Sequence, residues 1–71
     1  MNNLRTNLRE ARIDSGLSAE EAAEKIGCHF NSLLAWERGD TEPLAKNIIK
    51  LSKLYGKDPD YLLAIDNDNA D

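Results

Sequence analysis

One glycine constrains the fold of this 71-residue chain more than any other residue. Gly27 follows a short stretch with helical signals, and a second apolar pair, Leu33 and Trp36, resumes beyond it at i, i+3. Two short helices that flank a tight turn explain this pattern. Glycine suits such a turn, because a left-handed backbone conformation costs other residues energy.

The segment from Ala19 to Arg38 meets the packing demands of a helix-turn-helix. Ala23 is small at the point where the second helix would cross close to the first. Five positions must be apolar to seat both helices on the rest of the domain. All five are apolar: Ala22, Ile26, Cys28, Leu33 and Trp36. The spacing of Trp36 from Leu33 predicts a core anchor rather than a platform for stacked bases.

Two helices are also predicted before the turn. Apolar residues recur at i, i+4 and i+7 from Leu4 onward, which predicts a helix over about residues 3–14. Ser18 and Glu21 have the spacing of a capping box, in which a hydroxyl and a carboxylate satisfy amide donors left open at a helix start. The helix that they open is predicted to run to about Lys25.

Two more helices are predicted after the segment. A broad apolar stripe places one of them from about Leu44 to Tyr55, and Pro43 suits its start. The stripe consists of Ile48, Ile49, Leu51, Leu54 and Tyr55. Asp58 and Pro59 supply an N-cap and a first helical position for a last short helix. This helix carries Tyr61, Leu62, Leu63 and Ile65.

These elements predict an all-α fold of five helices in one domain over residues 1–65. No strand-like alternation and no internal repeat interrupts the helical pattern. Residues 66–71 form a short acidic tail, which we expect to be disordered.

Charge and hydropathy exclude several classes of protein. The net charge is −4, and three of the acidic residues are Asp66, Asp68 and Asp71 in the tail. Residues 1–65 carry 9 basic and 10 acidic side chains, so the predicted domain is close to neutral. No apolar run approaches the roughly 20 residues of a membrane span. The start of the chain also lacks the order of a signal peptide, and we expect a cytoplasmic protein.

The sequence offers little to catalysis or metal binding. The single cysteine, Cys28, cannot form an internal disulfide. Cys28 and His29 have no second cysteine or histidine at ligand spacing, so a zinc site is not expected. The sequence also argues against an enzyme. It has one histidine, no glycine-rich nucleophile elbow and no phosphate-binding glycine loop. We therefore expect no metal and no cofactor.

Several short motifs carry a resemblance that covers nearly the whole chain apart from the tail. They are Gly16-Leu17-Ser18, Glu21-Ala22-Ala23, Gly27, Trp36-Glu37-Arg38-Gly39, Pro43 and Asp58-Pro59-Asp60-Tyr61-Leu62-Leu63. With these motifs the chain resembles the phage-repressor and Cro family of helix-turn-helix regulators, the XRE family. The resemblance implies a globule of five helices whose third helix recognises operator DNA, usually in a symmetric dimer. It also implies that Arg12 pairs with Glu37.

The resemblance places base contacts on the outward face of the third helix. That face comprises Phe30, Asn31, Leu34 and Ala35, with His29 at its start. The amide of Asn31 suits adenine, whereas the apolar side chains offer contact to thymine methyls. Contacts to the DNA backbone are expected from Ser18, Ala19, Ser32, Arg38 and Lys46, together with amides at the start of the second helix.

Charge near the recognition helix departs from the family pattern. Ala19 replaces a glutamine that clamps a phosphate in many relatives, and Asp40 and Glu42 stand where lysine or arginine is frequent. The basic residues lie instead at Arg5, Arg9, Arg38, Lys46, Lys50, Lys53 and Lys57. The four lysines follow one side of the predicted helix 44–55, which more often indicates a solvated face than a binding surface. Phosphate contacts set most of the affinity, and few basic residues lie near the recognition helix. We therefore expect DNA binding to depend on dimerisation.

Phe30 and Leu34 support an alternative function. They lie at i, i+4 on a face that the fold would turn to solvent, and exposed apolar pairs can mark a protein-binding surface. The alternative is a helix-turn-helix module, similar to an antirepressor or an adaptor, whose recognition helix binds protein. A third interpretation is self-association through the same surface. Three residues of the last helix are candidates for either the core or a dimer interface: Tyr61, Leu62 and Ile65.

Overall fold

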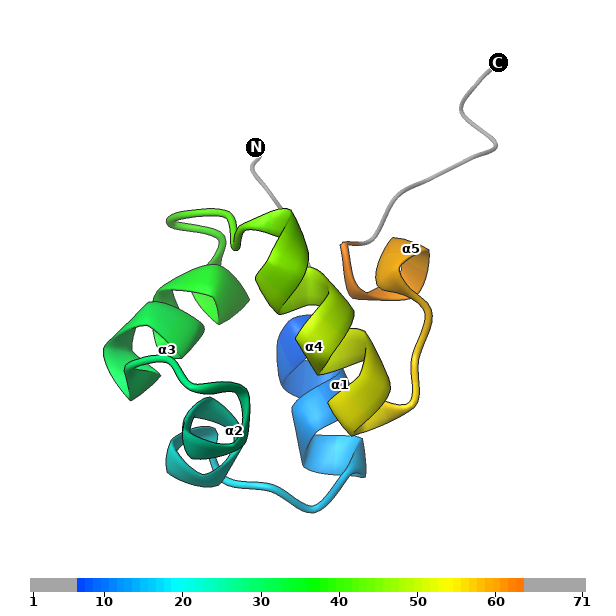
Figure 1. Ribbon diagram of the computed structural model, residues 1–71, viewed down its shortest axis with the longest axis horizontal. Helices are drawn as coiled ribbons and strands as arrows, with labels where there is room; N and C mark the ends of the chain where they lie inside the picture. The colour runs from blue at the N-terminus through cyan, green and yellow to red at the C-terminus, as the bar shows by residue number, and fades with distance from the viewer. Residues whose placement is uncertain (1–6, 64–71) are drawn as a thin grey trace.

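A computed structural model describes residues 7–63, in which five helices follow one another (Figure 1). They are α1 (Leu8–Asp14), α2 (Ala19–Ile26), α3 (Phe30–Arg38), α4 (Ala45–Tyr55) and α5 (Pro59–Leu62). Residues 7–63 contain no strand, and the predicted all-α fold is confirmed. Leu4, Arg5, Ile65 and the tail 66–71 lie outside the described residues.

The helices pack around one apolar core. In Figure 1, α4 passes in front of α1, with α2 and α3 to one side and α5 to the other. Four leucines from four different helices are fully buried: Leu8, Leu33, Leu51 and Leu62. Trp36 is buried in the same cluster, as predicted for a core anchor. No helix within the described residues is both long enough and apolar enough to cross a membrane.

Local signals in the sequence set most helix boundaries. The capping box at the start of α2 is present, because Glu21 N–H donates to Ser18 Oγ (3.0 Å) and Ser18 N–H donates to Glu21 Oε1 (2.9 Å). Gly27, at the end of α2, has a φ of 81°. Such a left-handed residue stops a helix and lets the chain turn back.

The start of α1 differs from the prediction. The spacing of apolar residues predicts a helix from about residue 3, but Asn7 is already non-helical and α1 begins at Leu8. Asn7 contacts α5 instead: its backbone N–H donates to the Leu62 carbonyl (3.0 Å), and its side-chain amide donates to the Tyr61 carbonyl (2.7 Å). These long-range bonds satisfy the C-terminal end of α5 and fix where α1 can begin.

Three details after α3 also differ from the prediction. Pro43 precedes Leu44, the N-cap of α4, so it lies outside that helix rather than at its first position. Ile49 is 51% exposed, because it follows the buried Ile48 and lies about 100° further around the helix. Asp58 occupies the N-cap of α5 as predicted, but its side chain accepts no capping hydrogen bond.

Candidate nucleic-acid interface

The turn between α2 and α3 fixes how the two helices cross. The N–H groups of Gly27 and Cys28 both donate to the Ala23 carbonyl, at 2.8 and 2.9 Å. His29 then returns to an extended conformation and is the N-cap of α3. Ala23 is 2% exposed, which agrees with the need for a small side chain at the crossing. The backbone therefore has the helix-turn-helix form.

The start of α3 presents its polar and aromatic side chains to solvent. Asn31 and Ser32 are exposed, and Phe30 is 36% exposed. Leu34 and Ala35, one turn further along, are half-buried. Residues 29–32 are therefore the accessible part of the predicted face, and Leu34 and Ala35 lie at its less accessible end.

His29 joins this face through two contacts within it. Its Nδ1 accepts the backbone N–H of Asn31 at 3.1 Å, so the imidazole caps α3. Its ring stacks on Phe30, with centroids 5.5 Å apart and ring planes 17° apart. In the structure His29 is therefore both a capping residue and an exposed one.

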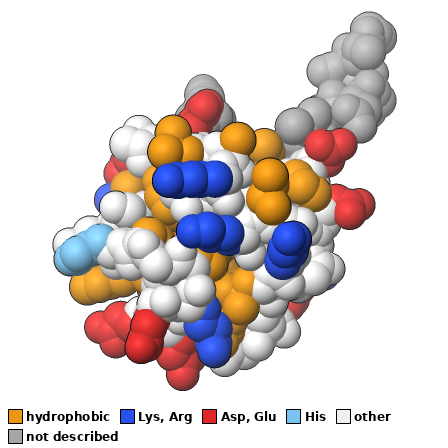
Figure 2. Space-filling view, in the orientation of Figure 1, with side chains coloured by type: hydrophobic (Ala, Val, Ile, Leu, Met, Phe, Trp, Pro, Cys, Tyr) orange, Lys and Arg blue, Asp and Glu red, His pale blue; other side chains and the backbone are white. Residues whose placement is uncertain are grey.

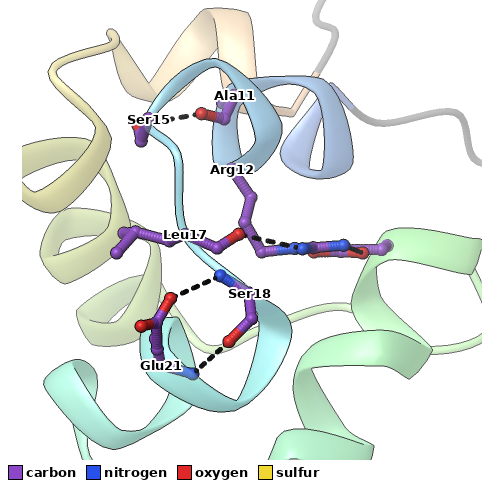
Figure 3. Close-up of polar contacts among 7 residues, drawn as sticks. Ala11, Arg12, Ser15, Leu17, Ser18 and Glu21 are labelled. Carbon is purple, nitrogen blue, oxygen red and sulfur yellow. Dashed lines mark hydrogen bonds and ion pairs between the residues drawn. The ribbon is translucent and has the colours of Figure 1, made fainter.

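The start of α2 combines donors with negative charge. Figure 3 shows Ser18 and Glu21 joined by the two bonds of the capping box. The Ser18 hydroxyl accepts one of these bonds and can still donate its own hydrogen. Ala19 packs against the core, so it could offer a phosphate only its backbone N–H. Glu20 and Glu21 are exposed beside it, and their charges oppose a phosphate.

Arg38, at the end of α3, already has a partner. Its Nε donates to Asp40 Oδ2 at 2.9 Å, and both side chains remain more than half exposed. An exposed pair of this kind is weak and exchanges readily with solvent or another anion. Glu42 in the same loop is exposed. The cation that could reach a phosphate here is thus partly neutralised.

The lysines of α4 and Lys57, which follows it, do not form one uniform row. Lys50 Nζ donates to the Ile26 carbonyl at 3.3 Å and so caps the C-terminal end of α2. Lys57 lies over the Tyr61 ring, with its Nζ 5.4 Å from the centroid. Lys46 and Lys53 are exposed. Figure 2 shows basic side chains over α4 together with apolar ones, and the exposed apolar residues there are Leu44 and Ile49.

Arg12 ties three parts of the domain together. Its Nε donates to Glu37 Oε2 at 2.6 Å and its Nη2 to Oε1 at 3.1 Å. Its Nη1 donates to the Leu17 carbonyl at 3.1 Å, a bond drawn in Figure 3. The hydrogen bonds to Glu37 raise the pKa of Arg12 although burial acts in the opposite direction. Because Glu37 lies in α3, this network holds the candidate helix against α1.

Two further side chains, Cys28 and Tyr55, carry no evident binding function. Cys28 is half-buried, and burial raises the pKa of its thiol, which keeps it protonated. The Tyr55 hydroxyl is buried without a hydrogen-bond partner, and burial raises its pKa to about 12. Residues 7–63 contain no cluster of three or more histidine, cysteine or carboxylate side chains that could hold a metal ion.

The candidate residues of the last helix differ in burial. Leu62 is fully buried and belongs to the core. Tyr61 is 38% exposed, with Lys57 over its ring. Ile65, the third candidate, lies outside the described residues.

Comparison with known proteins gives consistent matches. Residues 8–62 match the model of a family described as helix-turn-helix. The chain is 42% identical over 59 residues to the HTH-type transcriptional regulator ImmR of Bacillus subtilis (strain 168), covering 83% of this chain and 46% of that protein. It is 39% identical over 49 residues to the cryptic phage CTXphi transcriptional repressor RstR of Vibrio cholerae, covering 69% of this chain and 44% of that protein.

A third similar protein has about the length of this chain. It is an uncharacterized HTH-type transcriptional regulator of Archaeoglobus fulgidus, 26% identical over 65 residues, with 92% of this chain and 93% of that protein covered. By contrast, the chain spans less than half the length of ImmR and of RstR.

Proposed function

The chain belongs to the repressor-type helix-turn-helix family, and on this basis we propose that it is a sequence-specific DNA-binding transcriptional regulator. In this proposal α3 enters the major groove of operator DNA and the protein acts as a homodimer. Two of its relatives are named as a transcriptional regulator and a transcriptional repressor.

One observation carries the proposal: α3 has one side buried in the core and its start exposed to solvent. Leu33 and Trp36 are buried and hold the helix, while Asn31 and Ser32 are exposed at its start. A helix anchored in this way presents a rigid polar edge of the size that a major groove admits. The turn at Gly27 sets α2 beside it, so that the start of α2 can face the adjacent phosphates.

The exposed residues suggest a division of labour. Asn31 and Phe30 would contact base edges, with Leu34 and Ala35 at the less accessible end of the same face. Contacts to the DNA backbone would come from Ser18, Ser32, Arg38 and Lys46 and from the backbone amide of Ala19. Base contacts carry sequence preference, whereas backbone contacts supply affinity for every sequence.

The proposed dimer would compensate for the small number of phosphate contacts that a single domain can make. Arg38 is paired with Asp40, and Glu20 and Glu21 add negative charge at the start of α2. A single domain with few free cations near α3 binds DNA weakly, and a second copy on a symmetric site doubles the contacts. Tyr61 is a candidate for this interface, because it is exposed on α5.

A specific observation keeps a second function open. Phe30 is exposed, and acidic side chains flank the start of α2 and the loop after α3. A face with an aromatic centre and negative borders also suits a basic protein partner. The second candidate is therefore a protein-interaction module, similar to an antirepressor or an adaptor, that uses Phe30 and Leu34. Self-association through the same face is the third.

Selection of bound duplexes from a random pool at low salt distinguishes these functions. We expect the wild-type protein to enrich a palindromic site. Asn31→Ala should relax the sequence preference of the selected site, because it removes a base contact. Arg38→Ala should weaken binding to all sequences alike, because it removes a backbone contact. Equal loss of affinity in both variants would contradict the division of labour.

The double variant Phe30→Ser, Leu34→Ser tests the interaction module. If the wild type enriches no site, and the folded double variant loses binding to a protein partner that the wild type retains, the second candidate replaces the first. Circular dichroism of the double variant is the control, because Leu34 is half-buried and its loss could disturb the fold. A self-association surface would instead show as a loss of dimer in analytical ultracentrifugation.

A further inference from the structure

His29 and Phe30 form a stacked pair at the start of α3 that the fold does not require for its core. Both side chains are exposed, and neither belongs to the buried cluster. Their centroids lie 5.5 Å apart, with 17° between the ring planes. Stacking removes rotational freedom from both rings before any partner arrives, so a partner meets them already oriented.

A hydrogen bond determines which nitrogen of His29 can meet that partner. Nδ1 accepts the Asn31 N–H at 3.1 Å, and a ring nitrogen that accepts carries no proton. The proton of the neutral imidazole is therefore on Nε2. No hydrogen bond within residues 7–63 uses Nε2. His29 thus holds one oriented N–H donor on the accessible part of the recognition face.

The chemistry of the major groove matches this donor to one base. Guanine presents two neighbouring acceptors, N7 and O6, whereas adenine places a donor, N6, beside its N7, and thymine has a single acceptor, O4, next to its methyl group. A lone N–H donor therefore finds the most acceptors on guanine. Phe30 has no polar group to offer, and the apolar feature of the groove is the thymine methyl. The ring separation of 5.5 Å exceeds the rise of one base pair, roughly 3.4 Å, so the two rings are far enough apart to contact neighbouring base pairs.

We propose that His29 is a specificity-determining residue that donates its Nε2–H to a guanine, while Phe30 holds the imidazole and contacts the methyl of a neighbouring thymine. This inference rests on the proposed function, since it requires α3 to read DNA. His29 makes the direct contact, and Phe30 is in part a positioning residue for it. The half-site should then contain a guanine next to a thymine.

Two variants distinguish the N–H donor of His29 from the stacking by Phe30 that holds it in place. His29→Ser keeps a side-chain oxygen that can cap α3, because serine is a favoured N-cap residue, but removes the Nε2–H. Phe30→Leu keeps an apolar side chain for the thymine methyl but removes the stack. His29→Ala, which loses both cap and donor, is the comparison for any general loss of helix stability. Circular dichroism melting of all three variants checks that they fold.

The experiment uses the duplex selected by the wild-type protein and measures binding by fluorescence anisotropy. Each G·C pair of the half-site is replaced by A·T in turn, and each thymine is replaced by uracil, which lacks the methyl. One guanine replacement should weaken wild-type binding roughly threefold to tenfold, as expected for one hydrogen bond, and should have little effect on His29→Ser. Phe30→Leu should reduce this guanine preference yet stay sensitive to the uracil replacement.

Each outcome has one meaning. A guanine preference that disappears in His29→Ser supports the inference. A selected site at which His29→Ser keeps every base preference of the wild type overturns the inference and leaves the proposed function intact. Failure of the wild type to select any duplex overturns the proposed function, and the inference with it.

Discussion

Arg12 in α1 and Glu37 in α3 face each other through two parallel hydrogen bonds, at 2.6 and 3.1 Å. Their side chains are only 12% and 2% exposed. A charge in such surroundings depends on its partner, since neither can regain its hydration without unfolding. The pair therefore couples the position of the candidate recognition helix to the stability of the whole domain.

Glu37→Gln tests this coupling, because it removes the negative charge and keeps the shape of the side chain. We expect the free energy of unfolding to fall by about 3 kcal/mol, since the charge of Arg12 then stays buried without an opposite charge beside it. Urea denaturation at neutral pH measures the change. Replacing both residues with apolar ones, Arg12→Met with Glu37→Leu, should recover much of the loss, and an unstable double variant would argue against this explanation.

Arg38 and Asp40 provide the matched control, because they form a similar contact in water. Their side chains are 61% and 56% exposed. We expect Asp40→Asn to change the free energy of unfolding by no more than about 0.5 kcal/mol. A large effect in both pairs would mean that charge alone, rather than burial, accounts for the result.

Asp40→Asn should also strengthen DNA binding. The substitution frees Arg38 and removes a negative charge from the loop after α3, so affinity should rise for specific and unrelated duplexes alike. The slope of log affinity against log salt should become steeper. Fluorescence anisotropy over a salt series measures both, and a gain confined to one sequence would show that Asp40 takes part in base recognition.

Tyr55→Phe should stabilise the domain. The Tyr55 hydroxyl is buried without a hydrogen-bond partner in the structure, and such a group loses its hydration without compensation. We expect the free energy of unfolding at neutral pH to rise by about 1 kcal/mol. Tyr61→Phe, which removes a hydroxyl from an exposed ring, is the matched control. Destabilisation by Tyr55→Phe would show that the hydroxyl has a partner after all.

The same hydroxyl predicts a loss of stability at high pH. Burial raises its pKa in the folded state from 10 to about 12, so folding favours the protonated form. Its contribution is complete below pH 10 and is lost as the pH rises to about 12, because the unfolded chain loses this proton first. Unfolding curves between pH 9 and 12 should therefore show a smaller decline for Tyr55→Phe than for the wild-type protein.

Substitutions of Gly27 should destabilise the domain through backbone strain rather than through steric clashes. An added Cβ would meet no atom within 4 Å, but the φ of 81° is unfavourable for other residues. We expect Gly27→Ala to cost about 1 kcal/mol and Gly27→Asn less, because asparagine tolerates the left-handed region better. Thermal melting followed by circular dichroism tests the order, and equal losses would point to a steric cause.

The sequence was sufficient for features whose partners are close in the chain. Ser18 and Glu21 are three residues apart, so the capping box follows from spacing alone. Gly27, Gly39 and Gly56 each end a helix with positive φ, again a local requirement. The apolar periodicity of α4 likewise predicts its length to within one residue.

Among contacts between distant segments, the pairing of Arg12 with Glu37 was expected, and only from the family resemblance; the others were not predicted. Lys50 caps α2 from 24 residues away, and periodicity on α4 gives no sign that a neighbouring helix ends beside it. Asn7 likewise lies outside the helix that was predicted to include it, because it donates hydrogen bonds to carbonyls of α5, which is distant in sequence. One short-range contact was also not predicted: Arg38 and Asp40 are only two residues apart, but their pairing depends on the turn of the chain after α3, which glycine permits but does not specify.

The separation of α3 into buried and exposed residues has a consequence for how such a protein can diverge. Leu33 and Trp36 hold the helix, while residues 29–32 add nothing to the core. If α3 reads DNA as proposed, substitutions at those four positions would exchange one target for another at small cost in stability, provided that position 29 keeps a capping side chain. One fold could in this way serve many regulators that bind different DNA sequences.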